Sequence, residues 1–158
     1  MNKKPEERIG ILLREKGWRV AAAESCTGGL VGHRLTNVPG SSDYYQGSVT
    51  AYANAVKMRL LDVDEAILDE HGAVSAQTVT AMARGIRAAL SAELGISISG
   101  IAGPGGGTEE KPVGLVWIGL SAPDFDEARE HLFEGDRLAV KEQAAEAALQ
   151  MVIAFLEK

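Results

Sequence analysis

Short apolar runs alternate along this chain with segments whose apolar residues recur every three or four positions. The first pattern predicts buried strands, and the second predicts amphipathic helices. The expected strands cover residues 18–23, 46–53, 96–101, 114–121 and 129–133. The expected helices cover residues 5–16, 30–35, 54–61, 64–72, 75–94 and 136–155. Helices that follow strands at this cadence are typical of an α/β domain.

Polar residues and glycines at the segment borders predict where these helices begin and end. Four polar residues precede helical stripes and are expected N-caps: Asn54, Asp64, Ser75 and Asp136. Gly17 is placed to end the first helix. The expected apolar stripe of the longest central helix consists of Val79, Met82, Ala83, Ile86, Leu90 and Leu94.

The last two expected strands are joined by residues 122–126, whose Pro and Asp favour a turn, so they predict an antiparallel hairpin. The sheet should therefore be mixed. A chain of 158 residues with 46% hydrophobic residues can bury one complete core and is too short for two ordinary domains. We expect one domain over residues 1–158, a three-layer α/β/α arrangement with helices flanking the sheet.

Composition narrows the class of protein. The net charge of -6 and the pI near 5.1 argue against a nucleic-acid-binding surface, which is normally basic. A single cysteine excludes an internal disulfide and suits a reducing cytosol. The charged N-terminus lacks the apolar segment of a signal peptide, and no apolar run approaches the roughly 20 residues that span a membrane. We expect a cytoplasmic homo-oligomer that binds neither nucleic acid nor membrane.

The first candidate for chemistry is Ser25, which lies between an expected strand and an expected helix in the run Glu-Ser-Cys-Thr-Gly-Gly. Such a bend exposes a hydroxyl, and the first amides of the following helix point back toward it as possible oxyanion donors. This is the logic of the nucleophile elbow, although the sequence is not G-x-S-x-G. The alternative is an ordinary helix N-cap. Cys26 is a competing nucleophile if the helix N-terminus lowers its pKa.

A serine nucleophile needs a base, for which the chain offers a lysine and three histidines. Lys57 would have to be buried beside apolar walls, because its pKa must fall from about 10.4 to roughly 7 or 8. Tyr52 lies five positions before Lys57 and so does not fit the Tyr-x-x-x-Lys spacing of short-chain dehydrogenases. The rival bases are His33, His71 and His131, and no spacing marks any of them as a triad member.

Two further segments have features typical of ligand-binding sites. Residues 99–114 form a glycine-dense loop whose amides can approach a bound group closely, although a mobile surface loop is the alternative. The loop fits neither the P-loop nor the Rossmann fingerprint. Arg137 falls in the first turn of the last helix, where a cation is favoured when an anion such as a phosphate also binds.

Together these motifs resemble a known family. The resemblance rests on residues 23–29 (AESCTGG), 39–42 (PGSS), 49–52 (VTAY), 71–75 (HGAVS), 97–106 (SISGIAGPGG), 111–114 (KPVG) and 135–137 (GDR). Over residues 5–157 the chain resembles the C-terminal domain of the competence/damage-inducible protein CinA, which standing alone resembles nicotinamide-nucleotide amidase. Longer members carry an additional N-terminal domain similar to molybdopterin-binding proteins, which we expect this chain to lack.

The resemblance implies an amide hydrolase that converts nicotinamide mononucleotide to nicotinic acid mononucleotide and ammonia in bacterial pyridine-nucleotide recycling. By analogy, Ser25 attacks the carboxamide, Lys57 takes its proton and Tyr52 assists as a hydrogen-bond partner. The implied substrate-binding residues are Thr27, Gly28, Gly29, Gly103, Gly105, Gly106 and Arg137. The oxyanion would be held by amides of residues 26–29 or of residues 103–107. The family implies no metal and no organic cofactor, and no zinc-type Cys/His spacing occurs in the sequence.

Two other functions remain compatible with the sequence. The same Ser/Lys site could hydrolyse another small amide, because no feature of the sequence identifies the pyridinium ring as the group recognised. A non-catalytic binding or regulatory domain would use the glycine-rich pocket without turnover. Release of ammonia from nicotinamide mononucleotide separates these possibilities.

Overall fold

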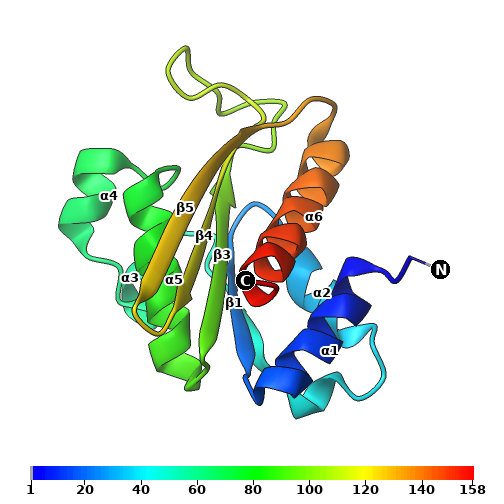
Figure 1. Ribbon diagram of the computed structural model, residues 1–158. Coiled ribbons are helices and arrows are strands. Elements are labelled where there is room, and N and C mark those ends of the chain that lie inside the picture. Colours follow the sequence, from blue (N-terminus) through cyan, green and yellow to red (C-terminus); the bar gives the residue numbers. More distant parts are fainter. Residues whose placement is uncertain (1) are drawn as a thin grey trace.

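A five-stranded mixed sheet forms the middle layer of the computed structural model, which describes residues 2–158 (Figure 1). The strands are β1 (Val20–Glu24), β2 (Tyr45–Thr50), β3 (Leu94–Gly100), β4 (Leu115–Ala122) and β5 (Phe125–Leu132). Their order is β2-β1-β3-β4-β5, with β1 parallel to β2 and β3, and with β4 antiparallel to both β3 and β5. The expected α/β class and the mixed sheet are confirmed.

Helices cover both faces of the sheet (Figure 1). The helices are α1 (Pro5–Lys16), α2 (Leu30–Thr36), α3 (Asn54–Leu61), α4 (Glu65–His71), α5 (Ala76–Leu90) and α6 (Arg137–Leu156), with a short 3₁₀ turn at Ser41–Asp43. Helices α1, α2 and α6 pack on one face, and α3, α4 and α5 lie on the other. Successive β1 residues point to opposite faces, so Ala22 joins the first core and Ala21 and Ala23 join the second.

Most of the expected helix borders are confirmed. The side chains of Asp64, Ser75 and Asp136 each accept a hydrogen bond from an amide of the helix that follows. Asn54 was wrongly expected to be a cap: Ala53 holds the N-cap position, and Asn54 is the first helical residue. Leu94 does not belong to the central helix but begins β3, because α5 ends at Leu90 and Ser91 adopts a left-handed conformation with φ 52°.

The last hairpin differs most from its expected form. Strand β5 begins at Phe125, four residues earlier than expected, so only Pro123 and Asp124 form the turn. The physical reason is that β5 is an edge strand with one partner, β4. Its many charged residues are tolerated on the solvent side of an edge strand, and they hide the strand from a hydrophobicity pattern.

The strand directions determine where loops meet. Since β1, β2 and β3 are parallel, the residues after their carboxyl ends lie at one edge of the sheet. These are Ser25 after β1, Ala51 and Tyr52 after β2, and the long 101–114 loop after β3. The first turn of α6 reaches the same edge, because Arg137 contacts Gly103 and Tyr52. In the described part of the chain, no helix has the length and hydrophobicity required to cross a bilayer.

Candidate active site

Ser25 and Lys57, which lie 32 positions apart in the sequence, meet at the carboxyl edge of the sheet. The Ser25 amide donates to the Ile98 carbonyl across the parallel pair, which holds the residue at the end of β1. Lys57 lies in the first turn of α3, and its Nζ is 3.2 Å from the Ser25 Oγ. The side chain of Lys57 is 1% exposed, so this contact is shielded from bulk water.

Two carbonyl oxygens complete the surroundings of the Lys57 amine. Its Nζ lies 2.8 Å from the Ala51 oxygen and 3.2 Å from the Tyr52 oxygen. A neutral amine has two N–H donors and one lone pair, so two N–H groups directed at these carbonyls leave the lone pair facing the Ser25 hydroxyl. The same arrangement also accommodates an ammonium, so the protonation state depends on the pKa of Lys57.

Burial lowers the pKa of Lys57, because it penalises the charged ammonium. A thiolate at Cys26 would oppose this shift. However, burial also raises the pKa of the Cys26 thiol to about 11, so the thiol is neutral near pH 7. Lys57 is therefore shifted toward the base form, while Cys26 lacks the thiolate character of a nucleophile.

Glu24 is a site residue whose role the sequence left open. Its side chain is completely buried and accepts hydrogen bonds from the Thr27 hydroxyl at 2.7 Å and from the Val31 and Gly32 amides at 2.9 and 3.0 Å. The first-turn amides of α2 were expected to point at Ser25, and this expectation is wrong because Glu24 binds those of Val31 and Gly32 and the Leu30 amide donates to the Thr27 carbonyl. The available signal was an acidic residue at the end of an otherwise apolar strand.

The turn between Ser25 and α2 still presents unpaired amides. The Gly28 amide donates to the Ser25 carbonyl at 3.1 Å, which closes the turn. Within residues 2–158, the amides of Cys26, Thr27 and Gly29 have no hydrogen-bond acceptor. Of the residue 26–29 amides expected to hold an oxyanion, these three are available and the Gly28 amide is not; the alternative set in residues 103–107 stays a prediction.

Arg137 joins two other parts of the edge. Its guanidinium donates to the Gly103 carbonyl at 2.6 Å and to the Tyr52 hydroxyl at 3.1 Å. The Tyr52 side chain is 63% exposed and makes no hydrogen bond to Ser25 within the described chain, so it is the carbonyl of Tyr52 that reaches Lys57. The structure thus brings Tyr52, Arg137 and Gly103 together as a bridge beside the Ser25–Lys57 pair.

The glycine-rich loop is exposed over most of its length. Gly103 is buried, whereas Gly105 and Gly106 are exposed; a Cβ on Gly105 would meet no atom within 4 Å, and one on Gly106 would meet only the Ile101 Cγ2 at 3.8 Å. The far end of the loop is held by Lys111, whose Nζ donates to the His71 carbonyl at 2.6 Å. The loop is therefore attached at both ends and open in the middle.

The rival bases lie elsewhere. His33 is exposed on α2, His71 lies 3.7 Å from Glu70 at the end of α4, and His131 stacks on Phe133 in β5. None of the three hydrogen-bonds to Ser25 in the structure as described. Residues 2–158 also contain no cluster of three His, Cys, Asp or Glu side chains arranged to hold a metal ion.

Comparison with known proteins places the chain in a family. Residues 2–156 match the family described as the CinA C-terminal domain. The chain belongs to the CinA C-terminal domain family. It is 54% identical over 145 residues to a CinA-like protein of Salinibacter ruber and 55% identical over 129 residues to a CinA-like protein of Synechocystis, which corresponds to 92% and 82% of this chain. It spans only about a third of those proteins, 35% and 31% of their lengths.

Solved CinA structures share the whole fold. A competence or damage-inducible protein from Enterobacter asburiae superposes with a TM-score of 0.94 at 34% identity, covering 98% of this chain and 99% of that one. A competence/damage inducible protein from Agrobacterium tumefaciens has a TM-score of 0.90 at 35% identity, with complete coverage of both chains. The architecture derived from β1 to α6 is thus the architecture of CinA-family structures.

Proposed function

We propose that this protein hydrolyses the amide of nicotinamide mononucleotide, with Ser25 as the nucleophile and Lys57 as the base. The observation that carries the proposal is the 3.2 Å separation between the Lys57 Nζ and the Ser25 Oγ in a buried site. A buried lysine with a lowered pKa serves as a general base, and a serine beside it has the arrangement of an activated nucleophile. Membership of the CinA family supports the choice of substrate class.

The first half of the reaction forms an acyl-enzyme. As the Ser25 Oγ attacks the carboxamide carbon, its proton passes to the neutral Lys57 amine. The oxygen of the tetrahedral intermediate carries the negative charge, and amides of Cys26, Thr27 and Gly29 are the available donors for it. Lys57 then gives its proton to the departing nitrogen, the C–N bond breaks, and ammonia leaves.

The second half returns the enzyme to its starting state. Water attacks the ester carbon while Lys57 takes a proton from it. The bond to Ser25 breaks, Lys57 returns the proton to the serine oxygen, and nicotinic acid mononucleotide leaves. The carbonyls of Ala51 and Tyr52 hold the amine in one position through both halves, which limits the reorganisation that each proton transfer needs.

The test is ammonia release from nicotinamide mononucleotide by the full chain, the Ser25→Ala variant and a Ser42→Ala control. Ser42 is an exposed serine of the 3₁₀ turn, so the control changes the same chemical group away from the site. We expect release by the parent chain and by Ser42→Ala, and none above background by Ser25→Ala. Substrate-dependent thermal stabilisation without release would support a binding domain instead, and release from a different small amide alone would change the substrate.

A further inference from the structure

We propose that Lys141 binds the phosphate of the substrate in a cavity beside the Ser25 turn, and so makes the site selective for a nucleotide over the corresponding nucleoside. This inference rests on the proposed amidase function, since it assigns a second part of the same substrate. It assigns a residue that the sequence motifs do not include.

The cavity has a volume of about 380 Å³. It lies between residues 27–30 of the turn and the α6 side chains Leu138, Lys141 and Glu142, with His33 at its side. The Lys141 Nζ is 3.5 Å from the position where a Cβ would stand on Gly28. The ammonium therefore lies against the glycine turn, because Gly28 has no side chain to fill the space between them.

Lys141 differs from every comparable cation in the described chain. Among the lysines and arginines of residues 2–158 that are buried or partly buried, it alone has no hydrogen bond, ion pair or aromatic contact. The Lys141 side chain is partly buried and lines the cavity, so its ammonium is held near the turn with no acidic side chain paired to it in the described chain. An anionic ligand in the cavity would provide the missing partner.

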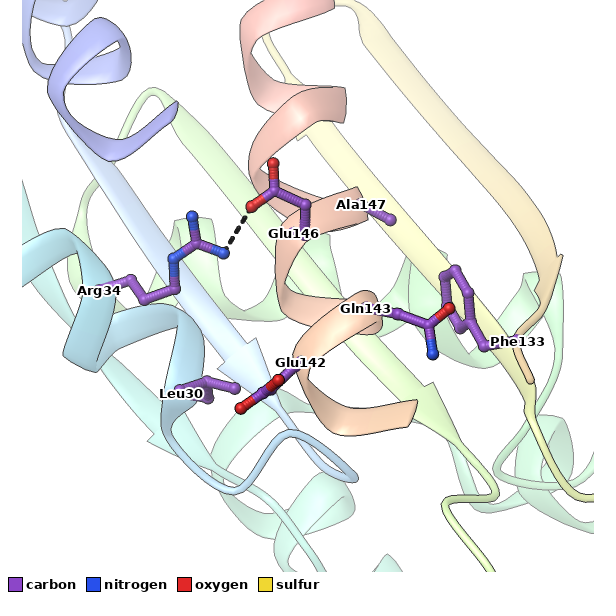
Figure 2. Close-up of a pocket in the computed structure, with 7 residues that line it drawn as sticks. All are labelled: Leu30, Arg34, Phe133, Glu142, Gln143, Glu146 and Ala147. Atoms are coloured by element: carbon purple, nitrogen blue, oxygen red, sulfur yellow. Dashed lines mark ion pairs between the residues drawn. The ribbon is translucent and has the colours of Figure 1, made fainter. Parts of the chain in front are cut away.

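In the neighbouring cavity the cation is already paired with carboxylates (Figure 2). It lies between the same two helices, α2 and α6, and shares Leu30 and Glu142 with the first cavity. Its cation, Arg34, is paired at 2.7 Å with Glu146, as drawn in Figure 2, and at 2.7 Å with Glu6. The positive charge available to an anion is therefore on the Lys141 side.

The separation between Lys141 and Ser25 is compatible with a substrate whose phosphate and amide are joined through one ribose. The hydrogen bond from the Gly28 amide to the Ser25 carbonyl closes a turn, which keeps the Cα atoms of these residues within about 7 Å. The Lys141 Nζ therefore lies within roughly 12 Å of the Ser25 Cα. The charges of Lys141 and Lys57 both act on the Cys26 thiol and lower its pKa against the larger effect of burial, which supports this proximity.

The other groups around the cavity set the balance of charge. His33 adds a cation only when protonated, and Glu142 opposes an anion. Arg137 lies one helical turn before Lys141, but its guanidinium already donates to Gly103 and Tyr52. Lys141 is thus the cation with no competing acceptor, and a lysine binds phosphate as a compact point charge.

The test compares nicotinamide mononucleotide with nicotinamide riboside, which lacks the phosphate, in the parent chain, Lys141→Met, Lys141→Arg and Lys16→Met. Lys16 is an exposed lysine that lies over the Trp18 ring, so its variant is a control for loss of one positive charge. We expect Lys141→Met to raise the KM for the mononucleotide by about tenfold to a hundredfold, the effect of one charge-assisted hydrogen bond. The kcat for both compounds and the KM for the riboside should stay within about twofold, Lys141→Arg should recover most of the loss, and Lys16→Met should match the parent chain.

Two outcomes separate failure of this inference from failure of the proposed function. If the parent chain releases ammonia and Lys141→Met keeps the parent KM for the mononucleotide, the phosphate subsite is wrong and the amidase stands. If the parent chain releases no ammonia, the amidase is wrong, and thermal stabilisation by inorganic phosphate still tests the cavity. Stabilisation that Lys141→Met abolishes and Glu142→Gln strengthens would support an anion site, and equal stabilisation of all variants would overturn it.

Discussion

Two loops at the same edge of the sheet are built in opposite ways. Where β1 ends, its last residue Glu24 and the following Ser25 are buried, and both side chains have protein partners. The loop after β3 is exposed through residues 104–110 and is held mainly where Arg137 meets Gly103 and Lys111 meets His71. The first loop is fixed by buried side-chain hydrogen bonds, whereas the exposed stretch of the second is held within itself only by the hydrogen bonds between Thr108 and Lys111. The comparison therefore predicts large effects from changes in the turn and small ones from changes in the loop.

The largest effect should come from Lys57→Met, which keeps a side chain of similar length and removes the amine. Loss of a general base typically lowers kcat by about 10²–10⁴-fold. Steady-state ammonia release would measure it, with thermal unfolding as the check that the variant folds. A kcat within tenfold of the parent chain would contradict the assignment of Lys57 as base.

The next effect should be loss of stability in Glu24→Ala. This change leaves the Val31 and Gly32 amides and the Thr27 hydroxyl without their buried acceptor. We expect the free energy of unfolding to fall by about 3 kcal/mol and the melting temperature to fall by roughly 6–12 °C. Urea unfolding would measure the first quantity, and calorimetry would measure the second.

Glu157→Ala provides the matched control for that experiment. Glu157 makes an exposed ion pair with Arg8 at 3.0 Å, so its removal should cost less than about 1 kcal/mol. If both variants lost the same stability, Glu24 would be no more important to the turn than a surface carboxylate.

A third effect concerns pH. Only the unprotonated amine of Lys57 accepts a proton, so kcat/KM should rise about tenfold per pH unit and level off above the pKa of Lys57. Burial lowers this pKa, so the plateau should begin below the usual value of about 10.4. Cys26→Ala should leave the profile unchanged, because the thiol remains neutral below about 11. Lys57→Arg should abolish this rise of kcat/KM with pH, since arginine stays charged. If Cys26→Ala shifted the pH at which kcat/KM rises, the titrating group would be the thiol instead of Lys57.

The smallest effect should come from Lys111→Met in the loop. It removes the hydrogen bond to the His71 carbonyl and frees one end of residues 101–114. We expect the KM to rise a few-fold, kcat to stay within about twofold, and amide hydrogen exchange to accelerate at Val113 and Gly114. A loss of kcat comparable to that of Lys57→Met would mean that the loop is as pre-organised as the turn.

Much of the fold could be predicted because its signals are local. The caps at Asp64, Ser75 and Asp136 are visible as polar residues before apolar stripes, and β3 and β4 are visible as apolar runs. The failures occurred where tertiary context overrides a local pattern. Strand β5 carries charges because its outer edge faces solvent, and Leu94 continues the spacing of a helix that has already ended.

The site residues also differ in how far the sequence could predict them. Ser25 could be proposed from a strand-to-helix turn, and Lys57 only as one of several bases. Glu24 was part of the motif but its role was left open, and Lys141 was not singled out at all. The role of Glu24 depends on amides seven and eight positions away, and that of Lys141 on the lack of any neighbour able to pair with it.

The sequence alone determined the helices and most of the strands, the serine on its bend and the family to which the motifs belong, because periodicity, capping and turn geometry act over a few residues. The tertiary structure decided which distant groups meet. Parallel pairing of β1 with β2 and β3 brings Ser25 to Lys57, the return of α6 sets Arg137 over Gly103, and burial lowers the pKa of the amine. Those outcomes depend on strand order and packing density, which no short stretch of sequence encodes.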